Sequence, residues 1–326
     1  MTNTEATVAL LCPQSPDAEV HVLAPRLVPL GGPRAMTVRR TLPHRMRSFV
    51  GAWCFVDHYG PDDVGTSGGM DVPPHPHTGL QTLSWLFSGE VEHRDSAGVH
   101  AVVRPGEVNL MTAGHGIAHS EVSTRSTSVL HGVQLWVVLP QADRGAARDF
   151  QHHRPPLVEV APGVRARVLV GALAGEASPV RTATPLLGAE LHLAAGARCT
   201  IPVDPGHEHG LLIDRGTARL CGTPLGSGEL GVVDAGRHGL ALATDEPTRG
   251  LLLGGAPFGE EVVMWWNFIG ATHEDIEQAR ADWQDGSDRF GAVLGYRGEV
   301  PRLTAPPLPR VRLRPRGPRR APGSGG

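Results

Sequence analysis

Short stretches of alternating apolar and polar residues fill the first half of this chain, between about residues 20 and 139. Turn sequences such as S-G-E, D-S-A-G and R-P-G separate them, at intervals of roughly eight to twelve residues. We find no helical periodicity in this half. The pattern therefore predicts an antiparallel β-barrel or β-sandwich, with strands that include residues 80–87, 90–94, 101–103, 107–112 and 130–139.

The second half repeats this pattern. The stretch R-P-G-E-V-N-L-M-T-A-G-H-G returns as G-S-G-E-L-G-V-V-D-A-G-R-H when Gly106 is aligned with Gly228, a shift of 122 positions. A repeat of this length predicts two copies of one strand-rich unit. Since 326 residues are about twice the usual length of a single domain, two domains are also expected from length.

One helix is predicted near the C-terminus. Thr272 and Asp275 have the spacing of a capping box, in which each side chain satisfies a backbone N–H at the start of a helix. Ile276, Ala279 and Trp283 follow at helical spacing and give the helix one apolar face. We expect this helix to pack on a barrel.

The two ends of the chain differ from the rest. Residues 1–19 form a loose leader without the pattern of a signal peptide, and from residue 301 the proline- and arginine-rich sequence predicts a disordered, solvated tail. The predicted organisation is a leader, a first barrel, a second barrel, a helical extension and a tail, at residues 1–19, 20–160, 161–270, 271–300 and 301–326.

Composition changes this picture little. The net charge of −3 gives no electrostatic reason to expect nucleic acid as a partner. The four cysteines lie far apart and are expected to be reduced thiols, and no apolar run approaches the roughly 18 residues of a membrane span. We therefore expect a cytoplasmic protein.

Two pairs of metal-binding residue types carry the chemical information. His75 and His77 lie in P-P-H-P-H, and His119 and Glu121 lie in A-H-S-E, so each pair has the period of a β-strand and both members project from one face. Three imidazoles and one carboxylate form a suitable ligand set for a divalent transition metal, and we expect iron. One or two coordination positions would remain for water or substrate.

The second copy of the repeat lacks these ligands. At the same shift, Ala241 and Ala243 take the places of His119 and Glu121. His207 and His209 form another H-x-H, but no partners lie at the corresponding distance, and a surface turn is the preferred interpretation.

Several stretches together resemble the pirin family of the cupin superfamily. They are P-H-P-H-T-G-L-Q-T, G-E-V-E-H-R-D-S-A-G, R-P-G-E-V-N-L-M-T-A-G-H-G-I-A-H-S-E and L-H-G-V-Q-L-W-V-V-L-P, and the resemblance extends from about residue 25 to about residue 295. It implies an all-β bicupin with two double-stranded β-helix (jelly-roll) barrels and metal only in the first. The pirin ligand positions correspond to His75, His77, His119 and Glu121.

The chain departs from this pattern at two positions. Gln81 stands where cupins usually have glutamate, a position that is not a metal ligand in pirins, and its amide could hydrogen-bond a bound substrate. His115 stands where pirins often have arginine, near the pocket mouth. It could shuttle protons there, or it could be a turn residue that faces solvent.

The resemblance implies an Fe(II)-dependent dioxygenase of the quercetin 2,3-dioxygenase type, with a flavonol or other phenolic substrate and O2. Glu121 would accept the substrate proton, and another small-molecule oxygenase would use the same site. The alternative is a regulator that senses metal or redox state and binds a protein partner without turnover. Pirins are commonly monomers, and we expect a monomer here.

Overall fold

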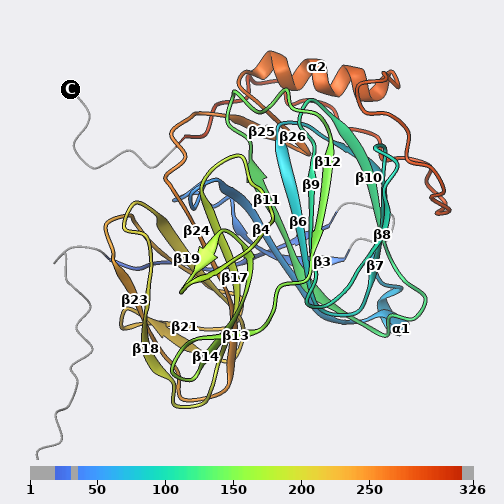
Figure 1. The fold of residues 1–326 in the computed structure, drawn as a ribbon. Coiled ribbons are helices and arrows are strands. Elements are labelled where there is room, and N and C mark those ends of the chain that lie inside the picture. The colour runs from blue at the N-terminus through green and yellow to red at the C-terminus, as the bar shows by residue number, and fades with distance from the viewer. Residues whose placement is uncertain (1–18, 31–35, 318–326) are drawn as a thin grey trace, which may run out of the picture.

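Two β-barrels stand side by side in the structure, and one longer helix covers the first of them (Figure 1). The computed structural model describes residues 19–30 and 36–317. The predicted leader up to residue 18 and the arginines at 319 and 320 lie outside this part of the chain. No helix in the described residues is long and apolar enough to span a membrane.

The first barrel consists of two facing antiparallel sheets. The larger sheet has the order β12 (Asp149–His153), β9 (Val108–Thr112), β6 (Leu80–Ser88), β11 (Val129–Val138), β4 (Trp53–Asp63), β3 (Thr37–Leu42) and β2 (Arg26–Pro29). The smaller sheet has the order β5 (Asp71–His77), β10 (Ile117–Ser123), β7 (Val91–Asp95) and β8 (His100–Val103). A short helix, α1 (Val64–Ser67), follows β4.

The second barrel repeats this arrangement. Its larger sheet has the order β1 (His21–Leu23), β22 (Leu230–Val233), β19 (Glu208–Arg215), β24 (Thr248–Gly255), β17 (Leu186–Leu193), β14 (Val164–Val170) and β13 (Val158–Ala161). Its smaller sheet has the order β18 (Arg198–Pro202), β23 (Gly239–Ala243), β20 (Ala218–Leu220) and β21 (Thr223–Leu225). Two hairpins complete the strands: β15 (Ala172–Leu173) with β16 (Glu176–Ala177), and β25 (Val263–Trp265) with β26 (Phe268–Gly270). The prediction of an all-β fold is confirmed.

The first strand in the described residues, β1, belongs to the second barrel. Leu23 of β1 lies opposite Leu230 of β22 in an antiparallel pair, although the predicted boundaries placed residues 20–160 in the first barrel. The reason is packing: Leu23 is fully buried in a core to which both barrels contribute. A strand of three residues gives no sequence signal for the sheet edge that it joins.

The two barrels share one hydrophobic core. Trp53 and Trp85 from the first barrel and Leu212 and Leu251 from the second are all fully buried in the same cluster. The indole Nε1–H of Trp53 is 3.1 Å from the carbonyl oxygens of both Leu187 and Gly254 in the second barrel. Since truncating a buried tryptophan typically costs ~3–5 kcal/mol, this side chain strongly couples the barrels.

Helix α2 (His273–Gln284) confirms the predicted capping box. The Thr272 side chain accepts a hydrogen bond from the Asp275 N–H, and the Asp275 side chain accepts one from the Thr272 N–H. The apolar face is buried at Ile276, Ala279 and Trp283, as predicted. The helix lies over the open end of the first barrel (Figure 1).

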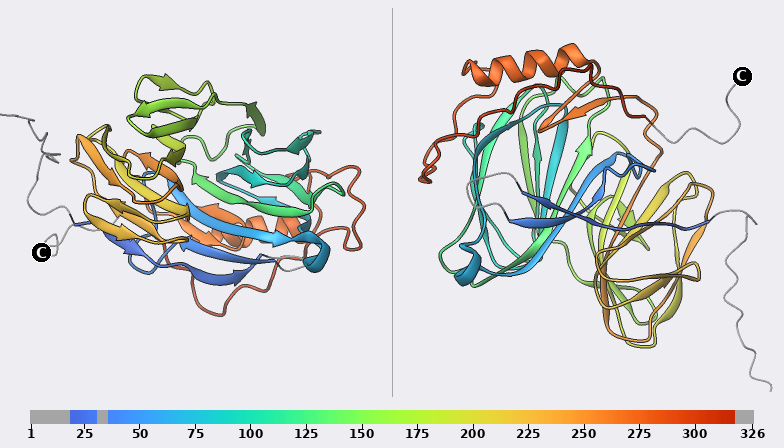
Figure 2. Two further views of the ribbon diagram at one scale, coloured as in Figure 1. Left: turned by 90° about the horizontal axis from the view of Figure 1, so that it is seen from below. Right: turned by 180° about the vertical axis from the view of Figure 1, so that it is seen from behind.

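The segment after α2 differs from the prediction of a disordered tail. Residues 301–317 run beside α2 and back along the first barrel (Figure 2, right). The Leu303 N–H donates to Pro74 O at 2.8 Å, and Val262 and Arg316 exchange two backbone hydrogen bonds of 2.8 and 2.7 Å. Ala305 is buried in the cluster that contains Trp283. This segment is ordered because it packs against an apolar surface beside α2. The composition of the segment gives no information about that surface.

Candidate metal centre

Three histidines meet inside the first barrel. His75 and His77 lie on β5 and His119 on β10, and the register of these antiparallel strands places His119 directly opposite His75. One ligand nitrogen from each lies within 4.8 Å of the others, and the Nε2 atoms of His77 and His119 are 3.0 Å apart. All three side chains are buried. The predicted period-two pairing therefore brings these three residues together.

Burial keeps these imidazoles neutral. It lowers the pKa of His75 to about 4 and the pKa values of His77 and His119 well below the usual value, and the neighbouring imidazoles add to the effect at His77 and His119. The Nδ1 of His75 is 2.9 Å from the carbonyl oxygen of Pro73, which can only accept a hydrogen bond. Nδ1 therefore carries the proton, and the lone pair of Nε2 is free for a metal.

Glu121, the fourth predicted ligand, is also buried on β10, but it is not one of the three residues whose ligand atoms lie within 4.8 Å of one another. The pairing of β10 with β5 shifts register between His119 and Glu121. The Ser84 hydroxyl donates to Glu121 Oε1 at 3.3 Å. Burial raises the pKa of Glu121, although His93 and the Ser84 hydrogen bond oppose the rise.

Sequence reasoning missed a chain of contacts behind the histidines. The Nδ1 atoms of His93 and His119 are 3.4 Å apart, and His93 Nε2 is 3.3 Å from Asp95 Oδ2. Asp95 Oδ1 accepts hydrogen bonds from two backbone N–H groups of the following turn. Carboxylate–histidine pairs of this kind orient metal ligands. The sequence shows the H-x-D spacing on β7, but it does not show that β7 pairs with β10.

The two predicted pocket residues lie in different surroundings. Gln81 is buried and its Nε2 donates to Thr112 Oγ1 at 2.9 Å. By strand alternation it shares a face with Leu83 and Trp85 of the common core, opposite the face from which Ser84 contacts Glu121. The structure therefore does not bring Gln81 to the three histidines.

His115 is exposed in its turn. Its N–H donates to Ala146 O, and its carbonyl accepts from Arg289 Nε at 3.0 Å. Its side chain borders a cavity of about 460 Å³ that also borders Thr78, the residue after His77. Both alternatives for His115, a place near the pocket and a solvent-facing turn, agree with this position.

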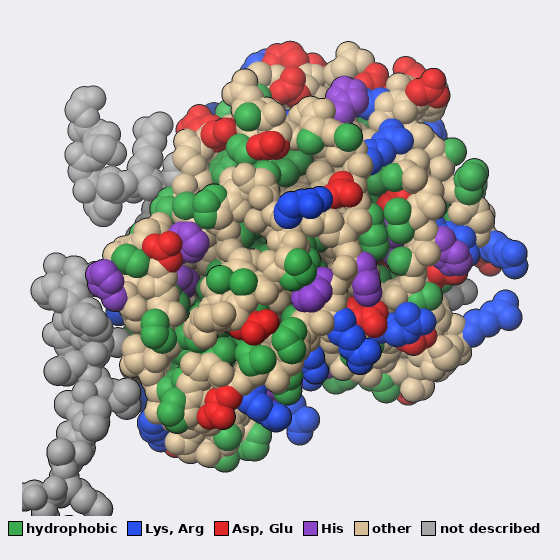
Figure 3. Space-filling view, viewed as in Figure 1, with side chains coloured by type: hydrophobic (Ala, Val, Ile, Leu, Met, Phe, Trp, Pro, Cys, Tyr) green, Lys and Arg blue, Asp and Glu red, His purple; other side chains and the backbone are tan. Residues whose placement is uncertain are grey.

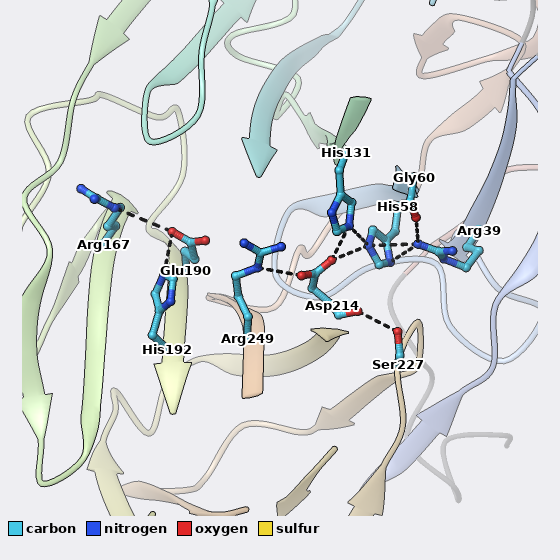
Figure 4. Close-up of polar contacts among 10 residues, drawn as sticks. All are labelled: Arg39, His58, Gly60, His131, Arg167, Glu190, His192, Asp214, Ser227 and Arg249. Carbon is cyan, nitrogen blue, oxygen red and sulfur yellow. Dashed lines mark hydrogen bonds and ion pairs between the residues drawn. The ribbon is translucent and has the colours of Figure 1, made fainter. Parts of the chain in front are cut away.

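A second cluster lies where the barrels meet (Figure 4). Asp214 of the second barrel places Oδ1 at 2.8 Å from His58 Nε2 and 2.7 Å from His131 Nε2, both in the first barrel. Its other oxygen accepts from Arg249 Nε at 2.7 Å. We call Asp214, His58 and His131 the barrel junction. Asp214 is 156 positions from His58, so no spacing in the sequence links them.

The barrel junction does not fit a metal ion, although its three ligand atoms are close enough to hold one. Arg39 Nη2 lies 3.2 and 3.3 Å from the two ring nitrogens of His58, and Arg249 binds the carboxylate. A divalent cation would add its charge to two guanidinium groups beside one carboxylate. Burial alone would raise the pKa of Asp214, but hydrogen bonds from the two histidines and the charge of Arg249 hold it far below its usual value.

Comparison with known proteins identifies the family. Residues 35–137 match the family Pirin, and residues 188–291 match the family described as "Pirin C-terminal cupin domain". The chain belongs to the pirin family. The predicted bicupin fold is thereby confirmed, with one cupin domain in each barrel.

Related proteins can be aligned with most of this chain. It is 44% identical to a Pseudomonas aeruginosa protein named "Putative quercetin 2,3-dioxygenase", over 95% of this chain and 98% of that protein. It is 37% identical to a "Pirin-like protein" of Caulobacter vibrioides, over 76% and 88% of the two chains. A crystal structure named as quercetin 2,3-dioxygenase from Acinetobacter baumannii superposes with a TM-score of 0.86 at 38% identity, over 91% of this chain and 97% of that one.

The second barrel of this pirin offers no comparable metal site. Ala241 pairs with Thr200 where the first barrel pairs His119 with His75. His209 is buried with neither ring nitrogen hydrogen-bonded, and His207 lies beside it at a ring separation of 6.1 Å. Within residues 19–30 and 36–317, the first-barrel histidines and the barrel junction are the only groups of three potential ligands that lie close enough to share an ion.

Proposed function

We propose that this pirin is an Fe(II)-dependent dioxygenase of the quercetin 2,3-dioxygenase type. The observation that carries the proposal is the convergence of three buried, neutral imidazoles, on paired strands of the first barrel, with a carboxylate two residues beyond one of them. The name of the Pseudomonas aeruginosa relative supports the choice of reaction.

His75, His77 and His119 would hold the ion, and Glu121 would complete the set or accept a proton. Neutral nitrogen donors with one carboxylate suit ferrous iron, and other divalent transition metals could also bind. When bound, the metal would supply a binding position for O2 and for an oxygen atom of the substrate. The barrel fixes both strands, so the donors are pre-organised.

Glu121 is suited to receive the proton of a flavonol 3-hydroxyl group. Burial raises its pKa, and a carboxylate whose pKa is closer to neutrality is a better general base at physiological pH. The Ser84 hydroxyl lies 3.3 Å from Glu121 Oε1 and 2.8 Å from Gln134 Oε1, and it can donate its single proton to one of them at a time. Removal of the hydroxyl proton would leave an anionic substrate oxygen that a divalent cation favours.

The overall reaction consumes one O2 per flavonol. Two bonds of the central ring break, both oxygen atoms enter the products, and one ring carbon leaves as carbon monoxide. The Trp136 indole contacts His77 edge-to-face at a ring separation of 5.1 Å. This gives the site an aromatic wall, which suits a flat phenolic substrate.

Oxygen consumption with quercetin tests the proposal. We expect iron-loaded protein to consume O2 and release carbon monoxide in equal amounts. His119→Ala should abolish both, and His100→Ala, which changes an exposed histidine on β8, should leave both unchanged. A flavone without the 3-hydroxyl group should not react. Equal rates for the parent and His119→Ala would exclude the proposed reaction at this site.

Glu121→Gln separates proton transfer from metal binding. We expect it to lower kcat by about 10²–10⁴-fold, the usual contribution of a general base. Metal content measured by elemental analysis should remain close to that of the parent if Glu121 acts mainly as the base. Loss of the metal together with activity would instead assign Glu121 as a ligand.

A further inference from the structure

Four neighbouring strands of the second barrel align basic residues and a histidine in one row. Arg165 on β14 lies opposite His192 on β17, His192 lies opposite Arg249 on β24, and Arg249 lies opposite Arg215 on β19. We call these four residues the basic row. Like charges directly opposite each other on neighbouring strands are destabilising, and Asp214 pairs with only one member of the pair Arg249 and Arg215.

The basic row lines a cavity. All four side chains border a space of about 620 Å³ at the end of these strands, which is large enough for a small organic molecule. The other charged residues on its wall are Glu159 and Glu246. Basic side chains, with acidic ones among them, gather on the face of the molecule where the two barrels meet (Figure 3).

Arg249 is held in place while part of its side chain stays available. Its Nε donates to Asp214 of the barrel junction at 2.7 Å, and its guanidinium carbon lies 4.0 Å from the centre of the Phe87 ring. Among the described residues, no hydrogen bond engages its two Nη groups, and its side chain is 25% exposed. A guanidinium fixed through Nε can present both Nη groups to an anion with little loss of conformational entropy.

His192 is also oriented. Its Nε2 lies 3.2 Å from Oε2 of Glu190, a buried carboxylate that Arg167 approaches to 3.8 Å (Figure 4). The carboxylate therefore already has two partners on the same sheet. His192 consequently keeps a fixed place in the middle of the basic row.

Arg165 and Arg215 are the accessible ends of the basic row. Both are exposed, and no ion pair within 4.0 Å engages either of them in the described part of the chain. Glu159 lies directly opposite Arg165 across β13 and β14 but forms no ion pair with it. Glu246 instead accepts a hydrogen bond from the Thr217 hydroxyl at 2.8 Å. The two carboxylates would repel an anion that extends beyond the row.

We propose that the basic row binds a small organic anion with two negatively charged groups, carboxylate or phosphate. Strands are spaced by roughly 4.8 Å, so Arg165 and Arg249, two strands apart, can hold groups separated by up to about 10 Å. Arginine forks match the geometry of both carboxylate and phosphate. This site is separate from the three histidines and does not depend on the dioxygenase proposal.

Calorimetric titration of the full chain tests the site. The probes are adipate, a dicarboxylate, and fructose 1,6-bisphosphate, each at constant ionic strength near 0.15 M, where nonspecific attraction is screened. We expect saturable binding of one probe molecule per chain, and the tighter probe identifies the charged group that the site prefers. The double variant Arg165→Gln/Arg215→Gln should weaken this binding at least tenfold.

Two controls decide the interpretation. Arg181→Gln removes an exposed arginine outside the cavity and should bind as the parent does. His75→Ala should also bind as the parent does, because it affects only the metal centre. The site is excluded if neither probe binds saturably, if the double variant binds like the parent, or if Arg181→Gln loses as much affinity. Unchanged melting temperatures would show that the exposed substitutions preserve the fold.

Discussion

Replacing Asp214 with asparagine should destabilise the protein by roughly 3–5 kcal/mol, the usual loss when one partner of a buried ionic contact is removed. The substitution keeps the size of the side chain but removes its charge. Asp214 accepts hydrogen bonds from His58, His131 and Arg249, and its side chain is fully buried. Asparagine cannot accept from all three donors, and the guanidinium of Arg249 loses its counter-charge.

The magnitude follows from the contacts. A hydrogen bond to a charged group is worth about 1.5–3 kcal/mol, so three such bonds would give a gross loss of about 4.5–9 kcal/mol. The Asn oxygen keeps part of this interaction, and Arg249 is partly exposed, so water can replace some of the rest. The net estimate is therefore about 3–5 kcal/mol, mostly below the gross loss.

Urea unfolding, followed by tryptophan fluorescence and circular dichroism, measures the effect. With a denaturant slope of about 3 kcal/mol per molar, the midpoint should fall by roughly 1–1.7 M. Asp245→Asn is the matched control, since Asp245 pairs with Arg198 on the same barrel but is 88% exposed. Its midpoint should equal that of the parent, because exposed ion pairs contribute little. If both variants unfold at the same urea concentration, the barrel junction does not stabilise the fold as argued.

Acidification should weaken the same junction. The pKa of Asp214 is held below its unfolded value of about 3.9, so its contribution is complete above that pH and is lost as the pH falls further. Burial also lowers the pKa of His58, so below about pH 6.5 the unfolded chain takes up this proton more readily. Both effects lower stability toward acid. Urea midpoints at pH 7.5, 5.5 and 4 should therefore fall in the parent because of His58, and the gap to Asp214→Asn should narrow only when the pH falls below about 4, where the Asp214 carboxylate of the unfolded chain is protonated. A midpoint that rises toward acid would contradict this sign.

Two further substitutions test other parts of the structure. His93→Ala should lower metal affinity about 10–100-fold, because His93 orients His119. Competition with a chelator measures this affinity, and His100→Ala is the control. Equal affinities for the two variants would show that His93 does not support metal binding. Trp283→Ala should cost ~3–5 kcal/mol and expose residues 301–317 to limited proteolysis, since the indole donates to Leu303 O at 2.8 Å. Protection equal to that of the parent would show that Trp283 does not hold this segment.

Local sequence patterns predicted several elements correctly. The capping box at Thr272 and Asp275 depends on residues three positions apart, and period-two spacing places His75 and His77 on one face of any strand. These features follow from backbone geometry within a few residues. The loss of metal ligands from the second copy was visible for the same reason, since Ala241 has no donor atom.

Contacts between distant strands were not predictable in this way. Gln81 was expected in the pocket, but its pairing with Thr112 and Val137 places it on the face of the shared core. The surroundings of a strand residue depend on what packs against its face of the sheet. That packing is set by the tertiary structure. The sheet face on which Gln81 lies can therefore be assigned only when the strand order is known.

By itself, the sequence determined the strand-rich class, the repeat, the capped helix and the His-x-His and His-x-Glu pairs, because each depends on residues that are neighbours along the chain. Only the tertiary structure decided that His93 supports His119, that Asp214 joins the barrels and that Arg165 and Arg215 flank one cavity. These contacts depend on strand pairing and register between segments up to 156 residues apart, which local spacing does not specify.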